Sequence, residues 1–532
     1  MVAETLDKAI HEWTAAIGAE NVVRDAGRLE SAETATFKTG RAVPAILLPS
    51  TREEVQACVR IAASTGTPVY PVSGGKNWGY GSRVPAAGGC AILDLRRMNR
   101  ILDFSEELAY VTIEPGVTQR QLIEFLSARN SALWMDATGA TPEASVLGNT
   151  VERGFGHTPY SDHFAHACGL EVVLPSGEIL ETGFARFPDA KTAPLYAYGF
   201  GPALDGLFTQ SGLGIVTRMS VWLMPRPAYF QAFFFTANRH QDLAPVVDAL
   251  RPLRLDGTLR SAVHIGNDYK VLSGLRQYPW QETGGQTPLT PEALAPFRKQ
   301  LNFGAWSGSG ALYGTKSQVA GARRMLRQAL RGRVSRLTFL DDKMLKVADR
   351  LARPFRAVTG WDLSRTLDLV KPLIGLQKGV PTDQPLKSCY WRKRGPVPVQ
   401  MDPDRDRCGL LWFAPVLPTR GVDAVRAADL AIEIVLRHGF EPALSLTLLT
   451  ERTIGCVISI GYDRDVSGED DRAMACHDEL VERFADEGYY PYRLGIQSMS
   501  LMQRPNSYNR FLQTICEAVD PAGIMAPGRY RP

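Results

Sequence analysis

Cysteine and histidine are scarce in this sequence, with eight of each among 532 residues. The cysteines are scattered without any Cys-x-x-Cys spacing, and no two histidines stand four residues apart. Disulfide frameworks and zinc sites depend on such spacings. We therefore expect neither a disulfide framework nor a metal site.

Long apolar stretches are also missing. No run reaches the roughly 18 apolar residues of a membrane span, and residues 1–8 lack the apolar segment of a signal peptide. The 60 basic and 56 acidic residues leave a net charge of +4, too balanced to indicate nucleic acid or an anionic membrane as partner. We expect a cytoplasmic protein, with basic clusters such as residues 323–324 and 392–394 on solvated faces.

Length and residue pattern indicate an α+β protein with more than one domain. Before a Pro-Arg-Pro break at residues 225–227, the pattern predicts helices at 6–17, 53–65 and 119–128 and strands at 45–48, 68–72, 109–113 and 170–174. Beyond the break it predicts strands such as 230–235 and helices such as 319–330 and 422–438. The loop at residues 395–406, rich in proline and aspartate, is expected to be exposed.

A glycine-rich loop at residues 71–82 carries four glycines together with Ser73 and Asn77, between apolar runs at 68–72 and 91–95. Glycine lets the backbone approach a ligand closely and adopts positive φ at low cost, so that several N–H groups can converge on one anion. The spacing is neither the Rossmann fingerprint nor a P-loop. We interpret the loop as a diphosphate cradle, with a glycine-rich turn that holds no ligand as the alternative.

Further motifs follow in order at residues 144–163, 170–177, 211–217, 247–254, 304–306, 311–315, 413–416 and 526–529. With the glycine loop they closely resemble the p-cresol methylhydroxylase and vanillyl-alcohol oxidase family of FAD-linked oxidoreductases, over nearly the whole chain. The resemblance implies an α+β fold with a two-subdomain FAD-binding domain at residues 1–227. An α+β substrate-binding cap would follow at 228–491, and residues 492–532 would return to the FAD-binding domain.

The resemblance also implies bound FAD. The residues expected to contact it are Ser73, Gly74, Gly75, Lys76, Asn77, Gly79, Ser145, Gly148, Asn149, Glu152, Gly154, His157, Tyr160, Gly214, Ile215, Val216, Arg493 and Arg529. Leu410 and Cys389 occupy the positions of the family's two covalent anchors, which favours noncovalent FAD. A covalent link through the neighbouring Tyr390 is the alternative.

In the family a para-substituted phenol binds as its phenolate, and hydride leaves the benzylic carbon for flavin N5 to form a p-quinone methide. Positive charge and hydrogen bonds must hold the phenolate, because a free phenol has a pKa of about 10. Tyr80, Tyr492 and Arg493 match the family's phenolate-binding residues, and a planar guanidinium can hold an oxyanion. The implied function is oxidation of a para-alkyl or para-alkenyl phenol to a hydroxylated or carbonyl product.

Two features of the family are missing. Ala140 and Thr141 stand where the oxidase has a carboxylate near flavin N5, and the nearest carboxylates, Asp136 and Glu143, are out of register. Glycine and cysteine at residues 455–456 stand in place of a pair of cap histidines. The proton acceptor is therefore unassigned.

Other functions remain open at this point. One is a flavin oxidase of the same fold that acts on a non-phenolic alcohol, a hydroxy acid or a sugar lactone. Another is a catalytically inactive flavin-fold binding protein. The electron acceptor is expected to be O₂ or a cytochrome c-type protein, and the assembly a homodimer or a higher oligomer.

Overall fold

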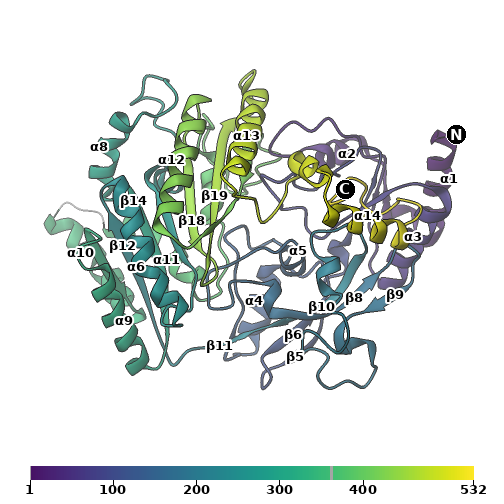
Figure 1. Cartoon of the computed structure of the whole chain (residues 1–532), viewed down its shortest axis with the longest axis horizontal. Coiled ribbons are helices and arrows are strands. Elements are labelled where there is room, and N and C mark those ends of the chain that lie inside the picture. The colour runs from purple at the N-terminus through teal and green to yellow at the C-terminus, as the bar shows by residue number, and fades with distance from the viewer. Residues whose placement is uncertain (1, 360–362) are drawn as a thin grey trace.

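A computed structural model describes residues 2–359 and 363–532. Figure 1 shows one large sheet with its helices in one half of the molecule, and smaller sheets together with both termini in the other half. The α+β class predicted from the sequence is confirmed. Across the described residues, no helix combines the length and the apolar character that crossing a bilayer requires.

The first small sheet flanks the glycine loop. Its strand order is β1 (Val22–Val23), β2 (Ile46–Leu47), β4 (Ala91–Asp94) and β3 (Val69–Val72), and helices α1 (Val2–Ile17), α2 (Ala26–Glu33) and α3 (Arg52–Thr65) accompany it. Helix α3 begins where the Thr51 hydroxyl accepts the N–H of Glu54, and it ends at Gly66 in the left-handed region. The loop leaves β3 and returns to β4, which run parallel as neighbours.

The second small sheet is antiparallel. Its strand order is β5 (Ile101–Ser105), β6 (Tyr110–Ile113), β10 (Ile215–Trp222), β8 (Ala167–Val173) and β9 (Ile179–Glu181). Its core also takes in apolar side chains of α4 (Gln119–Ala128), α5 (Val146–Val151) and α14 (Ser507–Val519). A ribbon of β7 (Leu133–Trp134) and β11 (Met224–Pro225) lies where the chain leaves this half.

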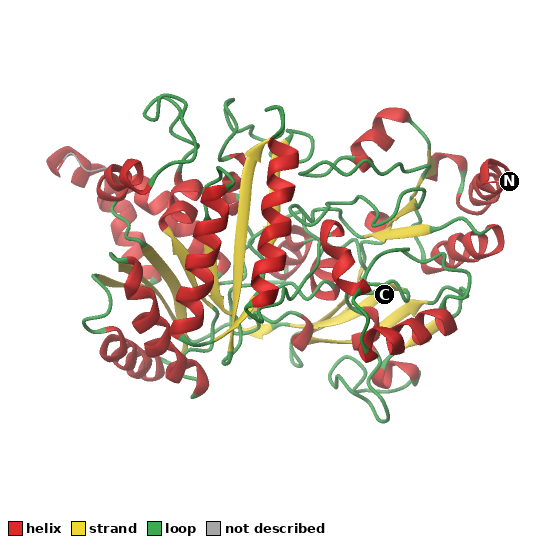
Figure 2. Cartoon of the chain, turned by 45° about the horizontal axis from the view of Figure 1, so that its top comes forward, coloured by secondary structure: helices red, strands yellow, loops and turns green. Residues whose placement is uncertain are grey.

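The cap is built on a large antiparallel sheet. Its strand order is β15 (Arg336–Leu340), β12 (Tyr229–Ala237), β14 (Trp306–Gly314), β13 (Val263–Asn267), β18 (Ala443–Leu448), β19 (Thr453–Asp463) and β16 (Cys408–Phe413), and β17 (Val416–Pro418) also pairs with β19. Four helices cover one face (Figures 1 and 2): α6 (Leu243–Leu255), α9 (Lys316–Leu330), α12 (Gly421–Arg437) and α13 (Glu469–Asp486). The remaining cap helices are α7 (Asp268–Leu275), α8 (Pro291–Leu301), α10 (Asp342–Thr359) and α11 (Leu363–Leu376).

The two faces of the cap sheet differ in chemistry because side chains alternate along a strand. In β18, Leu444 and Leu446 belong to the apolar core beneath α12 and α13, so Ser445 points to the other face. That other face meets the FAD-binding half: the His264 ring of β13 lies 4.2 Å from His157. This second, open face is polar around β13 and β18, where it meets the small-sheet half, and apolar at β12 and β16, whose side chains enter separate apolar clusters.

The C-terminal segment crosses back to the FAD-binding half. The N–H of Ala526 donates to the carbonyl of Val69 at 2.8 Å, and the N–H of Val69 donates to the carbonyl of Ile524 at 2.9 Å. These bonds add a short parallel stretch to the edge of β3. The division of the chain at residues 227 and 491, with a return of residues 492–532 to the FAD-binding domain, stays a prediction.

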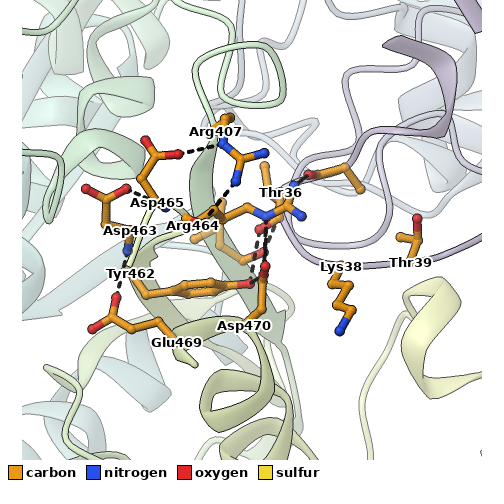
Figure 3. A network of polar contacts seen from close by, with 12 residues as sticks. Thr36, Lys38, Thr39, Arg407, Tyr462, Asp463, Arg464, Asp465, Glu469 and Asp470 are labelled. Carbon is orange, nitrogen blue, oxygen red and sulfur yellow. Dashed lines mark hydrogen bonds and ion pairs between the residues drawn. The ribbon is translucent and has the colours of Figure 1, made fainter. Parts of the chain in front are cut away.

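A polar network joins the cap to the segment before β2, and Figure 3 shows it from close by. Arg464 of β19's trailing turn contacts Asp470 at 3.2 Å and donates to the carbonyl of Ala35 at 2.6 Å. The Tyr462 hydroxyl donates to Asp470 at 2.7 Å. Thr36 then donates to the carbonyl of Leu410 at 2.8 Å and accepts the N–H of Gly79 at 3.0 Å, so the network reaches the glycine loop.

The expectation of a solvated face at residues 392–394 is wrong for Arg392. Its side chain is 1% exposed and donates to Glu441 at 2.8 Å and to Glu469 at 3.2 Å. Carboxylates far along the chain thus supply the compensation that a buried guanidinium requires. The ion pair of Arg392 with Glu441 ties the end of the short 3₁₀ helix Gln384–Tyr390 to the segment before β18.

The loop at residues 395–406 is exposed only in part, which corrects the expectation for its second half. Asp404 is buried and accepts hydrogen bonds from the Ser82 hydroxyl at 2.7 Å and from the Trp78 indole at 3.2 Å. The pKa of Asp404 is raised to about 7, chiefly by burial and also by the neighbouring Asp402, while the hydrogen bond from Ser82 opposes the shift. Asp404 therefore holds the end of the glycine loop in place.

Asp404→Asn should gain stability relative to the wild type as the pH rises from about 4 to about 7. The pKa of Asp404 is higher in the folded than in the unfolded wild type, so between these pH values the folded state binds more protons than the unfolded state. The wild type therefore loses stability as the pH rises, by up to about 1.4 kcal/mol per pH unit. An amide does not titrate. Thermal melts of both proteins across this range measure the difference, which should stop growing above pH 7; a difference independent of pH would contradict the assignment.

Candidate functional site

A cleft between the two small sheets and the C-terminal segment gathers most residues predicted to bind the cofactor. It encloses about 1090 Å³ of space that protein atoms do not fill, part of it open to solvent. The predicted residues that line it are Ser73, Gly74, Gly75, Lys76, Asn77, Ser145, Gly148, Asn149, Glu152, Gly214, Ile215, Val216, Arg493 and Arg529. Gly79, Gly154, His157 and Tyr160 lie outside this lining.

The glycine loop presents unpaired backbone donors to the cleft. Within the described residues, the N–H groups of residues 74–77 have no hydrogen-bond acceptor in the protein. Gly75 adopts a φ of +66°, a conformation that glycine takes without strain. Backbone N–H groups rarely remain unpaired, so these four fit an anion such as a diphosphate. Lys76 lies at the rim, 3.0 Å from Asp402.

The start of α5 closes against this loop. The Ser145 hydroxyl accepts the N–H of Gly148 at 2.8 Å and donates to the carbonyl of Pro115 at 2.6 Å. A Cβ on Gly148 would lie only 2.1 Å from the Ser73 hydroxyl oxygen. Glycine is therefore required at residue 148 for the two segments to approach each other.

A buried carboxylate between two guanidinium groups forms one wall of the cleft. Glu152 contacts Arg493 at 3.2 Å and forms an ion pair with Arg529. Burial raises the pKa of Glu152, but the two arginines lower it by more than burial raises it, so its pKa lies below the usual value. Arg493 also donates to the Asn77 side chain at 2.7 Å, and Arg529 donates to the Tyr70 hydroxyl at 2.8 Å. Two cations against one anion leave positive charge for a bound anion.

The structure brings Tyr80, Tyr492 and Arg493 together, although they come from distant segments. The Arg493 guanidinium lies 4.7 Å from the centre of the Tyr80 ring. Burial raises the pKa of Tyr80 well above the usual value, Tyr492 raises it further, and Arg493 opposes the shift. The Tyr80 hydroxyl is buried close to the Tyr492 side chain, and within the described part of the chain it makes no hydrogen bond of standard geometry.

Close packing explains the glycine on each side of Tyr80. Both Gly79 and Gly81 have positive φ, and a Cβ on them would lie 2.9 Å from Trp412 and 2.6 Å from Ile496 respectively. The Tyr80 carbonyl accepts the N–H of Ile496 at 3.0 Å. Gly79 thus allows the close packing that positions Tyr80, and it does not line the cleft.

The candidate covalent anchors lie in a separate apolar cluster with Trp78, away from the cleft lining. The Tyr390 hydroxyl donates to Asp406 at 2.6 Å, and burial together with this contact raises the pKa of Tyr390. Cys389 and Leu410 are buried in the same cluster. This placement supports noncovalent FAD, which stays a prediction.

A chain of polar contacts runs from the cleft toward the cap. Asn149 lines the cleft and contacts His163 at 2.6 Å, and His163 contacts Asp136 at 2.9 Å. Asp136 also accepts the N–H of His157, whose ring lies against His264. Burial lowers the pKa of His157 to about 4, which leaves the ring neutral at physiological pH. His157 is thus part of this network rather than a contact of the cleft.

Sequence reasoning missed three residues that shape the site. Asp404 fixes the glycine loop, Tyr70 binds Arg529, and Gln210 donates to the carbonyls of Glu152 and Tyr492 at 3.2 and 3.0 Å. The three aspartates at residues 402, 404 and 406 are the only feature of these that stands out in the sequence. The other contacts arise from the tertiary fold.

The cleft and the fold fit a flavin-linked oxidoreductase, and comparison with known proteins supports this class. A family model described as an FAD binding domain matches residues 43–183. The 1'-carboxy-chondrochloren decarboxylase of Chondromyces crocatus is 47% identical over 100% of this chain and 98% of its own length. The 4-cresol dehydrogenase [hydroxylating] flavoprotein subunit of Pseudomonas putida is 32% identical over 98% of this chain and 95% of its own.

A solved structure agrees over the whole fold. The 4-ethylphenol oxidase of Gulosibacter chungangensis, in complex with isoeugenol, superposes with a TM-score of 0.89 at 30% identity and covers 99% of this chain and 97% of its own. The chain belongs to the p-cresol methylhydroxylase and vanillyl-alcohol oxidase family of FAD-dependent oxidoreductases. The residues of the cleft fit FAD, because they supply unpaired N–H donors and positive charge for its diphosphate.

Gly74→Val should fold but lose FAD. A Cβ at residue 74 would meet its nearest protein atom at 3.7 Å, an ordinary contact, while the added methyl groups would occupy the diphosphate cradle. Flavin absorbance of the purified protein measures the occupancy. Gly88→Val is the matched control, since its Cβ has similar room at 3.8 Å in an exposed turn outside the cleft. Full occupancy in Gly74→Val would count against the cradle.

Acid precipitation should release the flavin into the supernatant, because the Tyr390 hydroxyl is engaged by Asp406 and no anchor residue lines the cleft. Fluorescence of the supernatant and of a denaturing gel measures the partition. Flavin that stays on the polypeptide would contradict noncovalent binding, and its loss in Tyr390→Phe would identify the anchor.

Proposed function

We propose that this protein oxidises a para-alkyl or para-alkenyl phenol at the benzylic carbon through a p-quinone methide. The unpaired, buried Tyr80 hydroxyl beside Arg493 is the observation that carries this proposal. A buried hydroxyl without a partner costs free energy unless a ligand completes it. A phenolate oxygen is a ligand that both groups can stabilise at once.

Tyr80, Tyr492 and Arg493 together form the phenolate clamp, and each has a distinct role. Tyr80 keeps its proton, because burial raises its pKa, and can donate a hydrogen bond to the phenolate. Arg493 stays charged, since Glu152 and the tyrosines raise its pKa more than burial lowers it. Tyr492 lies against Phe155 at 5.7 Å and adds a second phenol group beside the first. Positive charge beside the phenolate lowers the substrate's pKa.

When bound, FAD supplies the hydride acceptor. The protein's own contribution is to hold the substrate oxygen as an anion, whose electron pair drives hydride from the benzylic carbon. Arg493 touches both the clamp and the cleft, and its charge there can also stabilise negative charge on a bound cofactor. Ordinary alcohol or hydroxy-acid oxidation would have no use for this clamp, and neither would an inactive binding protein.

The fate of the quinone methide has two candidates. Hydration to an alcohol requires a base for water, and residues 140–141 and 455–456 offer no carboxylate or imidazole where the family has them. Loss of CO₂ requires no such base. If a carboxylate stands on the carbon next to the benzylic carbon, the electron pair of the breaking C–C bond becomes the new C=C bond, and the ring returns to a phenolate. The name of the relative from Chondromyces crocatus supports this second outcome.

Reoxidation of the flavin is assigned to O₂ or to a cytochrome c-type carrier. The name of the Gulosibacter enzyme, an oxidase, supports O₂. Steady-state turnover of one phenol with O₂ and with an artificial one-electron acceptor separates the two.

Arg493→Ala should weaken phenol binding and slow flavin reduction together. Arg493→Lys should restore only part of the lost binding and rate, because the ammonium group lacks the planar donor geometry of the guanidinium. Tyr80→Phe and Tyr492→Phe should each cost about 1.5–3 kcal/mol through loss of a hydrogen bond to a charged partner. Anaerobic stopped-flow bleaching of the flavin measures these rates. Tyr490→Phe, an exposed neighbour, is the control.

A para-alkyl anisole provides the decisive comparison. Methylation removes the acidic proton, so the anisole should bind and leave the flavin oxidised. Rapid reduction by the anisole would rule out the phenolate mechanism and return the enzyme to ordinary alcohol oxidation.

A further inference from the structure

The open face of the cap sheet carries small and polar side chains in register. Gly266 of β13 pairs with Ser307 of β14 on one side and with Ser445 of β18 on the other. Ser459 of β19 pairs with Trp412 of β16. The hydroxyls of Ser307 and Ser459 are buried and have no hydrogen-bond partner among the described residues. Buried hydroxyls are normally hydrogen-bonded, so these two hydroxyls are available to a bound partner.

Lys270, in the first turn of α7, places a cation over this face. A Cβ on Gly266 would lie 3.6 Å from Cγ of Lys270, so the lysine stem crosses the strand at its glycine. The ammonium nitrogen is 3.5 Å from the Ser388 hydroxyl, a contact at the limit of hydrogen bonding. In the described part of the chain, no carboxylate lies within 4.0 Å of this nitrogen.

The lack of an anion is unusual for a lysine at this depth. Burial lowers the pKa of Lys270, and only Cys389 opposes the shift. Lys270 nevertheless retains some accessible surface. Buried charges are otherwise paired or hydrogen-bonded, as with Arg392 and its two glutamates. An anionic ligand would supply the missing partner.

The phenolate clamp and Lys270 border the same region. Trp412, whose partner across the sheet is Ser459, lies 5.5 Å from the Tyr80 ring. Trp412 also packs on the apolar cluster that contains Cys389, the residue next to Ser388. One face of the cap sheet therefore leads from the clamp to the ammonium group.

We infer that Lys270 is a specificity-determining residue that binds a carboxylate on the para substituent of the substrate. The inference rests on the proposed function, since the clamp fixes the other end of the same molecule. The hydroxyls of Ser388, Ser307 and Ser459 provide further donors along this face. A substrate that carries an acid group would be selected over a plain alkylphenol.

Three probes separate the two ends of the molecule: 3-(4-hydroxyphenyl)propanoate, its methyl ester and 3-phenylpropanoate. Anaerobic calorimetric titration of the holoenzyme, with its flavin first reduced by dithionite so that it accepts no hydride, measures their dissociation constants. Lys270→Met should weaken both carboxylates roughly ten- to hundredfold, the range for a hydrogen bond to a charged group, and change the ester by no more than about twofold. Lys270→Arg should retain part of the preference for the acid.

Lys387→Met is the matched control, because Lys387 stands one residue from Ser388 and is exposed. It should leave all three dissociation constants unchanged. Lys270→Met should also melt no lower than the wild type without ligand, since it replaces an unpaired buried charge by an apolar chain of similar length. Equal losses for acid and ester, no loss for the acid, or a melt several degrees lower would each overturn the inference.

The same titrations distinguish failure of the inference from failure of the proposed function. If the phenol hydroxyl is unimportant, the wild type and Arg493→Ala will bind 3-phenylpropanoate as tightly as its hydroxylated analogue, whatever Lys270 does. If only the carboxylate site is wrong, the hydroxyl will retain its effect and Lys270→Met will not discriminate.

Discussion

The pairing of Glu152 with Arg493 and Arg529 is the interaction on which the site depends. It joins the end of α5 to two points of the C-terminal segment, and through Arg493 it reaches Asn77 of the glycine loop. A single carboxylate cannot neutralise two guanidinium groups. An excess of positive charge therefore lies where the cofactor cleft meets the proposed phenolate clamp, and both proposed ligands are anionic.

The parts of the site formed by contiguous sequence were predictable. The glycine loop between β3 and β4 and the start of α5 depend on local backbone conformation, which glycine and serine reveal directly. Arg392 could not be read in this way. Its glutamate partners lie about 50 and 80 residues away, and a run of three basic residues resembles a solvated face until the fold brings those carboxylates to it.

His157 and Asp404 show the same limit from opposite directions. His157 stands in a motif of the FAD-binding half, yet its ring faces His264 of the cap rather than the cleft. Asp404 stands in a loop that looks solvated, yet it anchors Trp78 and Ser82 beside the cradle. In both cases the role of the residue depends on which face of a distant element packs against it, and the residue type alone does not reveal this.

The route of the chain has a consequence for biosynthesis. Arg493 and Arg529 lie in the segment that returns from the cap to the edge of β3, so the anion-binding wall is incomplete in any shorter chain. A polypeptide that ends before residue 493 contains the strands of both small sheets, but it lacks the two arginines of this wall. Flavin is thus expected to load only after residue 529 has left the ribosome, and holoenzyme formation reports that residues 493–529 have docked.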